Sequence, residues 1–402
     1  MDIIKQVLNV DRFLACPYVE KNAMNTDNRT NPSSQVLPLI SELDFQLLPD
    51  LLKLAEDVRV ALEILNYAVK ISEHVDFLAD ILALQEARDN CAFDGVKVSV
   101  KDLYARLFRE KGSENAEHVL NCQKAMYEGY HRINECGAIA LGDLEEIVAM
   151  TLGCTSGIRS NMIGFSNSTH IQIQTKLGES VSYIPPHGKD LLQKHLADLW
   201  EYFNNDELYT QHPLIKLALA YIQFMRVYPY GDASGRIGRI MSTLWMCQRK
   251  YLNFPFFCLS GQLNANHSKH QNLLYAFSSL NDNDNLYECI NFVLQTWLKS
   301  AEWSLQIVEQ IKSLYKYHSS IDNFENMQRH SNEMRSVIDI IFQKKYVRIS
   351  DLVERGIHRQ TASGYLRRLI DFGLLQKLQV GKDNLYINSK VQKLFEQERT
   401  VL

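Results

Sequence analysis

Apolar residues recur at helical spacing along much of this chain. Between 40 and 84 the periodicity is long enough for two helices, and the same spacing returns at 212–227 and 237–248. The apolar positions that share one face of the 212–227 segment are Leu214, Leu217, Ala218, Tyr221 and Phe224. Alternation typical of strands occurs near the C-terminus, at 374–378 and 385–387. The pattern predicts several helices and one β-hairpin.

The segment 212–248 is predicted to form a helix, a loop and a second helix. Pro213 stands near the start of the first helix, where proline is favoured. Pro229 ends it, because proline removes a backbone donor and restricts the preceding residue. The loop then opens onto the N-terminus of the next helix, after Gly235. Backbone N–H groups and the helix dipole favour an anion there.

The loop residues suit the phosphates of a nucleotide. Arg236 and Arg239 can pair with phosphate oxygens, and Asp232 can hold a Mg2+ that bridges two phosphates. The small residues that let phosphates approach the backbone are Gly231, Ala233, Ser234 and Gly235. The same segment also fits a capped turn between core helices, with both arginines in surface salt bridges. A glycine-rich loop alone does not decide between these two interpretations.

Residues 333–402 are predicted to form a separate unit. A helix at 334–342 precedes a short one at 349–354, with Ser350 as its expected N-cap. A third helix follows at 357–369 and ends before Gly373; its inward positions are Ala362, Leu366 and Leu369. The two strands are joined by a hairpin turn at 381–384. This order of elements resembles a winged helix-turn-helix domain.

Composition limits the possible partners and chemistry. The 402 residues allow two or three domains, and the net charge of −4 restricts any nucleic-acid contact to a local patch. The eight cysteines have no C-x-x-C spacing, so neither a zinc site nor a disulfide framework is supported. Without a signal peptide or a long apolar run, we expect a cytoplasmic protein with no membrane contact. The polar stretch Asn22–Ser34 is expected to be a loop.

Residues 228–239 read Tyr-Pro-Tyr-Gly-Asp-Ala-Ser-Gly-Arg-Ile-Gly-Arg. They resemble the Fic family signature, His-Pro-Phe-x-Asp/Glu-Gly-Asn-Gly-Arg-x-x-Arg. The resemblance runs from about 60 to 340 and includes the segment 157–160, a hairpin at 178–187 and an amphipathic helix at 191–203.

The resemblance implies a mainly α fold. This fold is a Fic-type helical bundle with a small β-hairpin flap, followed by a C-terminal winged helix-turn-helix domain. The implied domains are an N-terminal helical region with an inhibitory-like helix at 1–100, a Fic (Fido) core at 101–330 and the winged helix-turn-helix domain at 331–402.

Fic enzymes usually transfer AMP from ATP to a protein hydroxyl, so the resemblance implies ATP, Mg2+ and a target protein as partners. In active members the first residue of the signature is a His that acts as general base. Here that position is Tyr228. A phenol with an ordinary pKa of roughly 10 is almost entirely protonated at neutral pH, and a general base should titrate near the working pH.

The remaining signature positions keep their implied roles. Asp232 would hold Mg2+, the loop from Gly231 to Gly235 and Arg236 would hold phosphates, and Arg239 would meet the γ-phosphate. Asn266 is the surviving residue of a stretch that helps to hold the nucleotide. The histidines at 267 and 270 could contact the base of a nucleotide, but on an otherwise polar helix they are expected to lie in solvent.

An inhibitory helix is common in the family, and residues 86–95 resemble it. Asp94 stands where the family has a Glu that pairs with the last arginine of the loop, here Arg239. The resemblance therefore implies an inhibitory role for Asp94. An ordinary helix C-terminus closed by Gly95 fits the same residues.

The winged helix resemblance implies a DNA contact by the helix at 357–369. His358, Arg359, Gln360, Thr361 and Ser363 would face base edges, and arginine and glutamine are suited to bidentate base contacts. Backbone contacts are expected from Arg367, Arg368, Lys377 and Lys382. Such domains also bind proteins, and they often act as dimers, so double-stranded DNA, a protein partner and a homodimer all stay open.

Three functions are compatible with these features. The first is a Fic-type protein with weak or no AMP transfer, acting as a nucleotide-binding regulator with a DNA-binding tail. The second is an active nucleotidyltransferase with altered chemistry at Tyr228. The third is a purely structural interaction protein, which the retained Asp232, Arg236 and Arg239 disfavour.

Overall fold

The computed structural model describes residues 37–43, 48–109, 113–154, 157–159, 171–174, 180–275, 283–320 and 331–402. The predicted loop at Asn22–Ser34 lies outside these ranges, as does Ser160 of the predicted segment 157–160. No helix within them is long and apolar enough to cross a membrane.

Two buried helices form the centre of the molecule. Helix α8 (Pro213–Val227) is mostly apolar, and every side chain from Leu214 onward is buried. A single 3₁₀ turn, Gly231–Ala233, connects it to α9 (Ser234–Gln248). The predicted helix–loop–helix is therefore confirmed, although α9 begins three residues earlier than the apolar pattern indicates.

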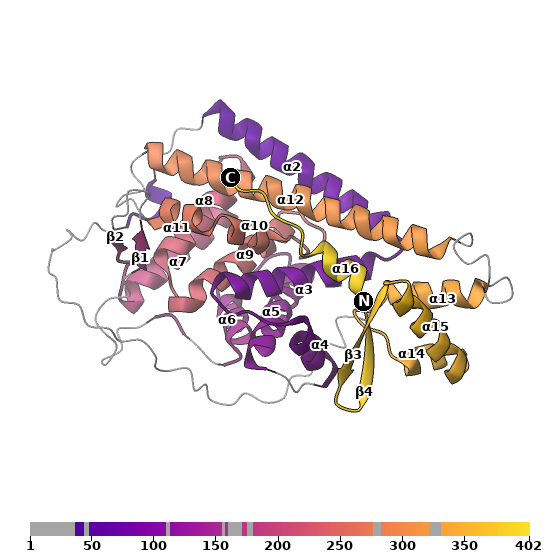
Figure 1. Cartoon of the computed structure of the whole chain (residues 1–402). Helices are drawn as coiled ribbons and strands as arrows, with labels where there is room; N and C mark the ends of the chain where they lie inside the picture. Colours follow the sequence, from indigo (N-terminus) through magenta and orange to yellow (C-terminus); the bar gives the residue numbers. More distant parts are fainter. Residues whose placement is uncertain are drawn as a thin grey trace.

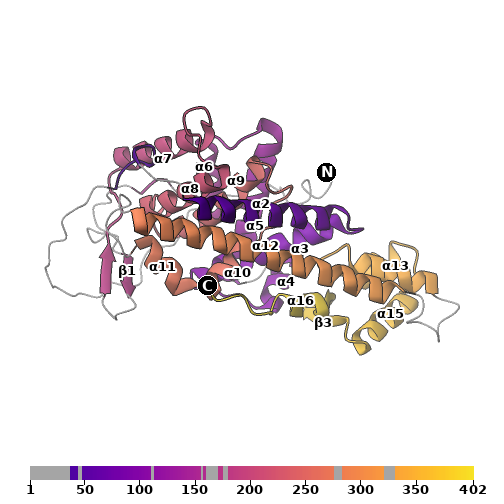
Figure 2. The same ribbon diagram turned by 90° about the horizontal axis from the view of Figure 1, so that it is seen from above.

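Further helices surround this pair. Helix α12 (Asn283–Ser319) lies along α2 (Pro49–Lys70), and together they cover one side of the bundle (Figures 1 and 2). The two helices predicted between 40 and 84 correspond to α2 and α3. The other helices of the bundle are α3 (Val75–Phe93), α4 (Val100–Arg109), α5 (Glu114–Cys136), α6 (Asp143–Leu152), α7 (Lys189–Asn204), α10 (Leu259–Ala265) and α11 (His267–Tyr275).

A two-stranded antiparallel hairpin lies at one end of the bundle (Figure 1). It pairs β1 (Ile171–Gln174) with β2 (Ser180–Tyr183), with Ile171 opposite Tyr183. The Tyr183 hydroxyl donates to the carbonyl of Arg226 at 2.9 Å, which ties the hairpin to the end of α8. The hairpin is thereby held beside the loop that follows α8.

The C-terminal module, residues 331–395, lies at the opposite end (Figures 1 and 2). Three helices precede an antiparallel pair of strands, in the predicted order. Ala362, Leu366 and Leu369 are buried as expected. The elements are α13 (Ser331–Ile341), α14 (Ile349–Val353), α15 (Arg359–Asp371), β3 (Leu375–Val380), β4 (Asp383–Asn388) and α16 (Ser389–Leu394).

Two local predictions in this module were wrong. Ser350 is not the N-cap of α14, because the helix already begins at Ile349 and the Asp351 carboxylate accepts from the backbone N–H of Arg348 at 2.6 Å. The strands also extend further than their alternation suggests, so that Val380 pairs with Asp383 across a tight turn.

The module is in contact with the helical bundle. Lys345 forms an ion pair with Asp80 at 2.8 Å, and Gln392 donates to the Tyr104 hydroxyl at 2.8 Å. Arg109 forms an ion pair with Asp383 at the hairpin. These contacts join α3 and α4 to the module.

Candidate anion site at the start of helix α9

The loop between α8 and α9 begins with a residue in an unusual conformation. Tyr228 has φ 50° and ψ 53°, in the left-handed region, and its N–H still bonds the carbonyl of Phe224 at 3.1 Å. For a residue with a side chain, this conformation costs roughly 1–2 kcal/mol. Its surroundings must therefore hold it in place.

Arg159 supplies much of that restraint. Its Nε donates to the carbonyl of Tyr228 at 2.8 Å, and its Nη2 donates to the carbonyls of Pro186 at 2.5 Å and Val227 at 3.2 Å. Its backbone N–H donates to the carbonyl of Pro229 at 2.8 Å. One residue thus joins the loop to the segment after the hairpin. In the sequence, Arg159 is noted only as part of the segment 157–160 that resembles the family. Its role could not be predicted, because its hydrogen-bond partners are backbone carbonyls, which leave no pattern of side chains in the sequence.

The Tyr228 phenol faces the loop acid. Its hydroxyl donates to Oδ1 of Asp232 at 3.3 Å, and Asp232 itself is exposed. Burial, followed by the negative charges of Asp232 and Asp94, raises the pKa of Tyr228 above its ordinary value. The group at this position is therefore a neutral hydrogen-bond donor at physiological pH.

The two arginines of the loop converge on one carboxylate. Oδ1 of Asp94 accepts a hydrogen bond from Nη2 of Arg239 at 2.9 Å, while Oδ2 lies 3.1 Å from Nε of Arg236. Asp94 follows the last residue of α3, so α3 closes the start of α9 with a negative charge. We call this pairing the Asp94 latch; the inhibitory role of Asp94 stays a prediction.

Arg239 is fully buried. Its Nε donates to Oδ1 of Asn90 at 2.6 Å, and its guanidinium lies 4.4 Å from the centre of the Phe93 ring. Surface salt bridges were one of the two interpretations of the loop, and for Arg239 that one was wrong. The partners come from α3, about 150 positions away, so local sequence does not show the burial.

One nitrogen of this buried cation is unsatisfied. Nη1 of Arg239 has no hydrogen-bond partner among the described residues. It lies 3.0 Å from the point where a Cβ on Gly235 would stand, so a side chain there would crowd the guanidinium. A buried donor without a partner is costly, and an anion would satisfy it. The predicted phosphate-binding backbone positions, Gly231, Ala233, Ser234 and Gly235, line the same short turn.

The predicted nucleotide residue Asn266 lies at the end of α10 and is buried. Its amide bonds neighbouring backbone: Nδ2 donates to the carbonyls of Gln262 at 3.0 Å and Thr400 at 2.9 Å. Thr400 belongs to the end of the chain, far from Asn266 in sequence. The side chain is therefore already engaged by protein.

The expectation that His270 lies in solvent was wrong. Its side chain is fully buried, its Nε2 lies 2.9 Å from the Tyr221 hydroxyl, and burial lowers its pKa to about 3. His267, by contrast, is exposed as expected, and its ring centre lies 4.5 Å from that of Phe93. The residues next to His270 in the sequence are polar and do not indicate its burial, which results from contacts with α3 and α8.

A buried acid that the loop motif does not include lies behind the latch. Glu86 of α3 accepts hydrogen bonds from the backbone N–H of Ser260 at 2.9 Å and from the Ser260 hydroxyl. Burial raises its pKa to about 8, although these hydrogen bonds and Arg239 act in the opposite direction. Sequence reasoning registers Glu86 only as a position in the helix that resembles an inhibitory one.

The predicted DNA-contacting residues lie in the C-terminal module. Arg359 and Gln360 are exposed in the first turn of α15, and Arg367 is exposed further along it. Thr361 and Ser363 are partly buried, Arg368 is exposed, and Lys377 and Lys382 are exposed on the hairpin. His358 accepts the backbone N–H of Gln360 and caps the helix, so its ring is committed to a structural bond.

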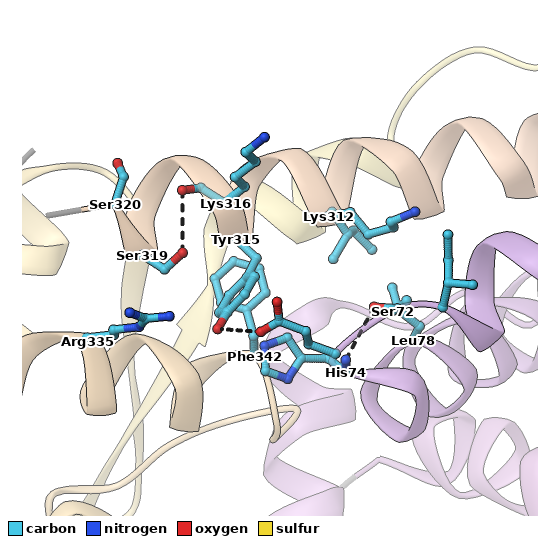
Figure 3. A pocket seen from close by; sticks show the side chains of 13 residues that line it. Ser72, His74, Leu78, Lys312, Tyr315, Lys316, Ser319, Ser320, Arg335 and Phe342 are labelled. Carbon is cyan, nitrogen blue, oxygen red and sulfur yellow. Dashed lines mark hydrogen bonds between the residues drawn. The ribbon is translucent and has the colours of Figure 1, made fainter. Parts of the chain in front are cut away.

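A cavity of about 660 Å³ lies elsewhere, between the turn after α2, the end of α12 and α13 (Figure 3). At this cavity His74 packs edge-on against Tyr315, with ring centres 4.3 Å apart. None of the predicted site residues lines this cavity. The described residues also contain no group of three or more His, Cys, Asp or Glu placed to hold a metal ion.

Comparison with known proteins adds two family matches. Residues 115–246 match the Fic/DOC family, and residues 325–391 match the family described as protein adenylyltransferase SoFic-like, C-terminal domain. The loop residues 228–239 lie inside the first match, whereas Asp94 and Asn266 lie outside it.

Solved structures of low sequence identity are also similar. A Fic domain-containing signaling protein from Bacteroides thetaiotaomicron VPI-5482 has a TM-score of 0.50 and 12% identity, over 63% of this chain and 97% of that one. A Fic family protein from Desulfovibrio desulfuricans G20 has a TM-score of 0.49 and 14% identity, over 86% and 98%. Fic-1 from C. elegans has a TM-score of 0.47 and 18% identity, over 66% and 75%. The first of these supports the fold of the bundle.

Proposed function

Because this chain contains a Fic/DOC family domain at residues 115–246, we propose that it binds the phosphates of a nucleotide, ATP by family resemblance, at the start of α9. We further propose that it transfers AMP to a protein hydroxyl weakly or not at all. On this view the protein is a nucleotide-binding regulator in which Asp94 competes with phosphate for two arginines.

The unsatisfied nitrogen of Arg239 carries this proposal. A buried guanidinium with a donor that has no partner among the described residues, beside a helix N-terminus, favours a negatively charged ligand. Arg236 approaches the same carboxylate from the other side. An anion that displaces Asp94 would receive charge-assisted hydrogen bonds from both arginines.

The residues are also compatible with Mg2+. Asp232 is exposed at the edge of the loop, and Mg2+ is commonly bound by one or two carboxylates together with substrate phosphates. Bound there, Mg2+ would neutralise phosphate charge. Asp232 also accepts the Tyr228 hydroxyl at 3.3 Å, so the same carboxylate would have to serve both groups.

Weak transfer follows from the group at position 228. A general base must accept a proton, and the Tyr228 phenol already holds one with a raised pKa. Loss of a general base typically lowers the rate roughly 100- to 10,000-fold. The alternative, an active enzyme with altered chemistry, would need another proton acceptor at this loop.

Thermal melting with MgATP, and with GTP, CTP and UTP in its place, tests nucleotide binding. A nucleotide at 100 times its Kd should stabilise the native state by about 2.7 kcal/mol, which raises the melting temperature by a few degrees. Arg236→Ala should abolish the rise, while Arg355→Ala removes an equal charge from the C-terminal module and should keep it. No rise with any nucleotide would contradict the proposal, and strong ATP self-labelling would favour the active-enzyme alternative.

For the C-terminal module we infer a second role, a contact with double-stranded DNA. The exposed side chains of Arg359, Gln360 and Arg367 on α15, with Lys382 on the hairpin, favour it. The chain as a whole is acidic, so this local cationic surface would carry the attraction. A module that binds protein instead is the alternative.

Fluorescence anisotropy with a mixed-sequence duplex tests the DNA contact. Binding should weaken steeply between 50 and 200 mM salt, and Lys382→Ala should lower the slope of log K against log salt by about 1. Lys53→Ala, an exposed lysine of α2, should leave the slope unchanged. If no salt-dependent binding is measured, the module does not serve as a DNA contact.

A further inference from the structure

The last residues of the chain return from the C-terminal module to the helical bundle. After α16, residues 396–402 run back across α10 (Figures 1 and 2). We call this segment the C-terminal strap. Gln397 begins the contact by donating to Oε1 of Gln310 on α12 at 2.9 Å.

The strap is anchored to α3 by a largely buried ion pair. Nη2 of Arg399 lies 3.2 Å from Oδ2 of Asp89, the two side chains are 8% and 17% exposed, and the guanidinium covers the Trp303 ring. Gly261 leaves room for this pair, because a Cβ there would lie within 2.6 Å of Oδ2 of Asp89 and would also clash with Arg399. Because the ion pair fits so closely against Gly261, we take the strap to be packed as part of the folded structure.

The end of the strap forms hydrogen bonds with the side chain of Asn266. The carbonyl of Thr400 accepts from Nδ2 of Asn266 at 2.9 Å and from Nε2 of Gln262 at 2.5 Å. The backbone N–H of Leu402 donates to Oδ1 of Asn266 at 2.6 Å. Both ends of the Asn266 amide are therefore bonded to the strap.

The same contacts lead to the Asp94 latch. Asp89 is followed on α3 by Asn90, which donates to the carbonyl of Arg236 at 3.2 Å and accepts from Arg239. Asn264 of α10 donates to the carbonyl of Asp89 at 2.9 Å. The strap, α10 and the end of α3 thus form one connected set of contacts behind the two arginines.

From this connection we propose that the C-terminal strap is an intramolecular lock on the anion site. While it is seated, it holds the end of α3 so that Asp94 stays on Arg236 and Arg239. Because the strap is continuous with α16, a displacement of the C-terminal module withdraws it, loosens the latch and opens the arginines to phosphate. The proposal rests on the proposed nucleotide site.

The test compares MgATP binding by calorimetry for the full chain and for a chain that stops after Gln397. Site-to-site coupling is typically 5- to 150-fold, so truncation should tighten the Kd by roughly that factor. Hydrogen exchange should also become faster in residues 86–95. Arg399→Ala keeps the chain length and should give a smaller change in the same direction, which decides the matter if the truncated chain does not fold. Arg355→Ala is the matched charge control.

Different results would contradict the proposed nucleotide site and the proposed lock. If Asp94→Ala tightens MgATP binding but truncation and Arg399→Ala leave it unchanged, the lock is overturned and the nucleotide site stands. If truncation weakens MgATP binding, the strap supports the site and the lock is likewise overturned. If none of these proteins binds MgATP, both proposals are overturned.

Discussion

Asp94→Ala will make the folded protein less stable and, at the same time, more responsive to phosphate. The substitution leaves the buried Arg239 and the nearly buried Arg236 without their shared counter-charge. Loss of one partner from a buried ion pair costs about 3–5 kcal/mol, and the partial exposure of Asp94 reduces the expected loss to about 1–3 kcal/mol. Melting should therefore occur several degrees lower in a buffer without multivalent anions.

Millimolar pyrophosphate or MgATP should then restore most of the lost stability of Asp94→Ala, because the anion replaces the carboxylate. Asp94→Glu retains the charge and is the conservative control; it should lose less stability and gain less from anions. A loss of stability that no anion restores would show that Asp94 only supports the fold and does not stand in for a ligand.

Glu86→Gln will remove much of the dependence of stability on pH. The pKa of Glu86 is raised from an ordinary value of 4.5 to about 8, so the folded protein binds a proton that the unfolded chain releases between these values. The free energy of unfolding should therefore be highest below about pH 4.5 for this group and fall as the pH rises to about 8. Each pKa unit corresponds to about 1.4 kcal/mol, which makes the effect a few kcal/mol.

Gln keeps the shape of protonated Glu86 and can still bond Ser260. Melting temperatures of the variant and the parent protein should be similar at pH 5, and the variant should melt higher at pH 9. Burial also raises the pKa of Asp89, so part of the slope will persist in the variant. Glu145→Gln, at an exposed position on α6, should leave the pH profile unchanged. Parallel profiles for Glu86→Gln and the parent protein would contradict the prediction.

The centre of the fold could be predicted because its signals are local. Pro213 and Pro229 mark the ends of α8, and the apolar positions around the helix indicate its burial. In the C-terminal module, three apolar residues at helical spacing identify the buried face of α15. Such features need no information about distant parts of the chain.

The environment of the candidate site could not be predicted in the same way. Arg239 is buried because Asn90 and Phe93 of α3 and the following Asp94 surround it, and His270 because Tyr221 and Phe93 cover it. The strap is a short polar sequence with no periodicity, and its importance arises from partners on α3 and α10. Charged and polar residues in sequence are ordinarily assigned to the surface, and here the tertiary contacts reverse that assignment.

Helix α12 also has a mechanical consequence. It is a single helix of 37 residues, which at 1.5 Å per residue is about 55 Å long. Its start lies near α11 and its end near the C-terminal module (Figure 2). A rod of this length works as a lever, so that a tilt of about 5° at one end moves the other end by about 5 Å. Because α12 packs along α2, any tilt of this size would have to carry α2 with it, and the module would then move by about the pitch of one helical turn.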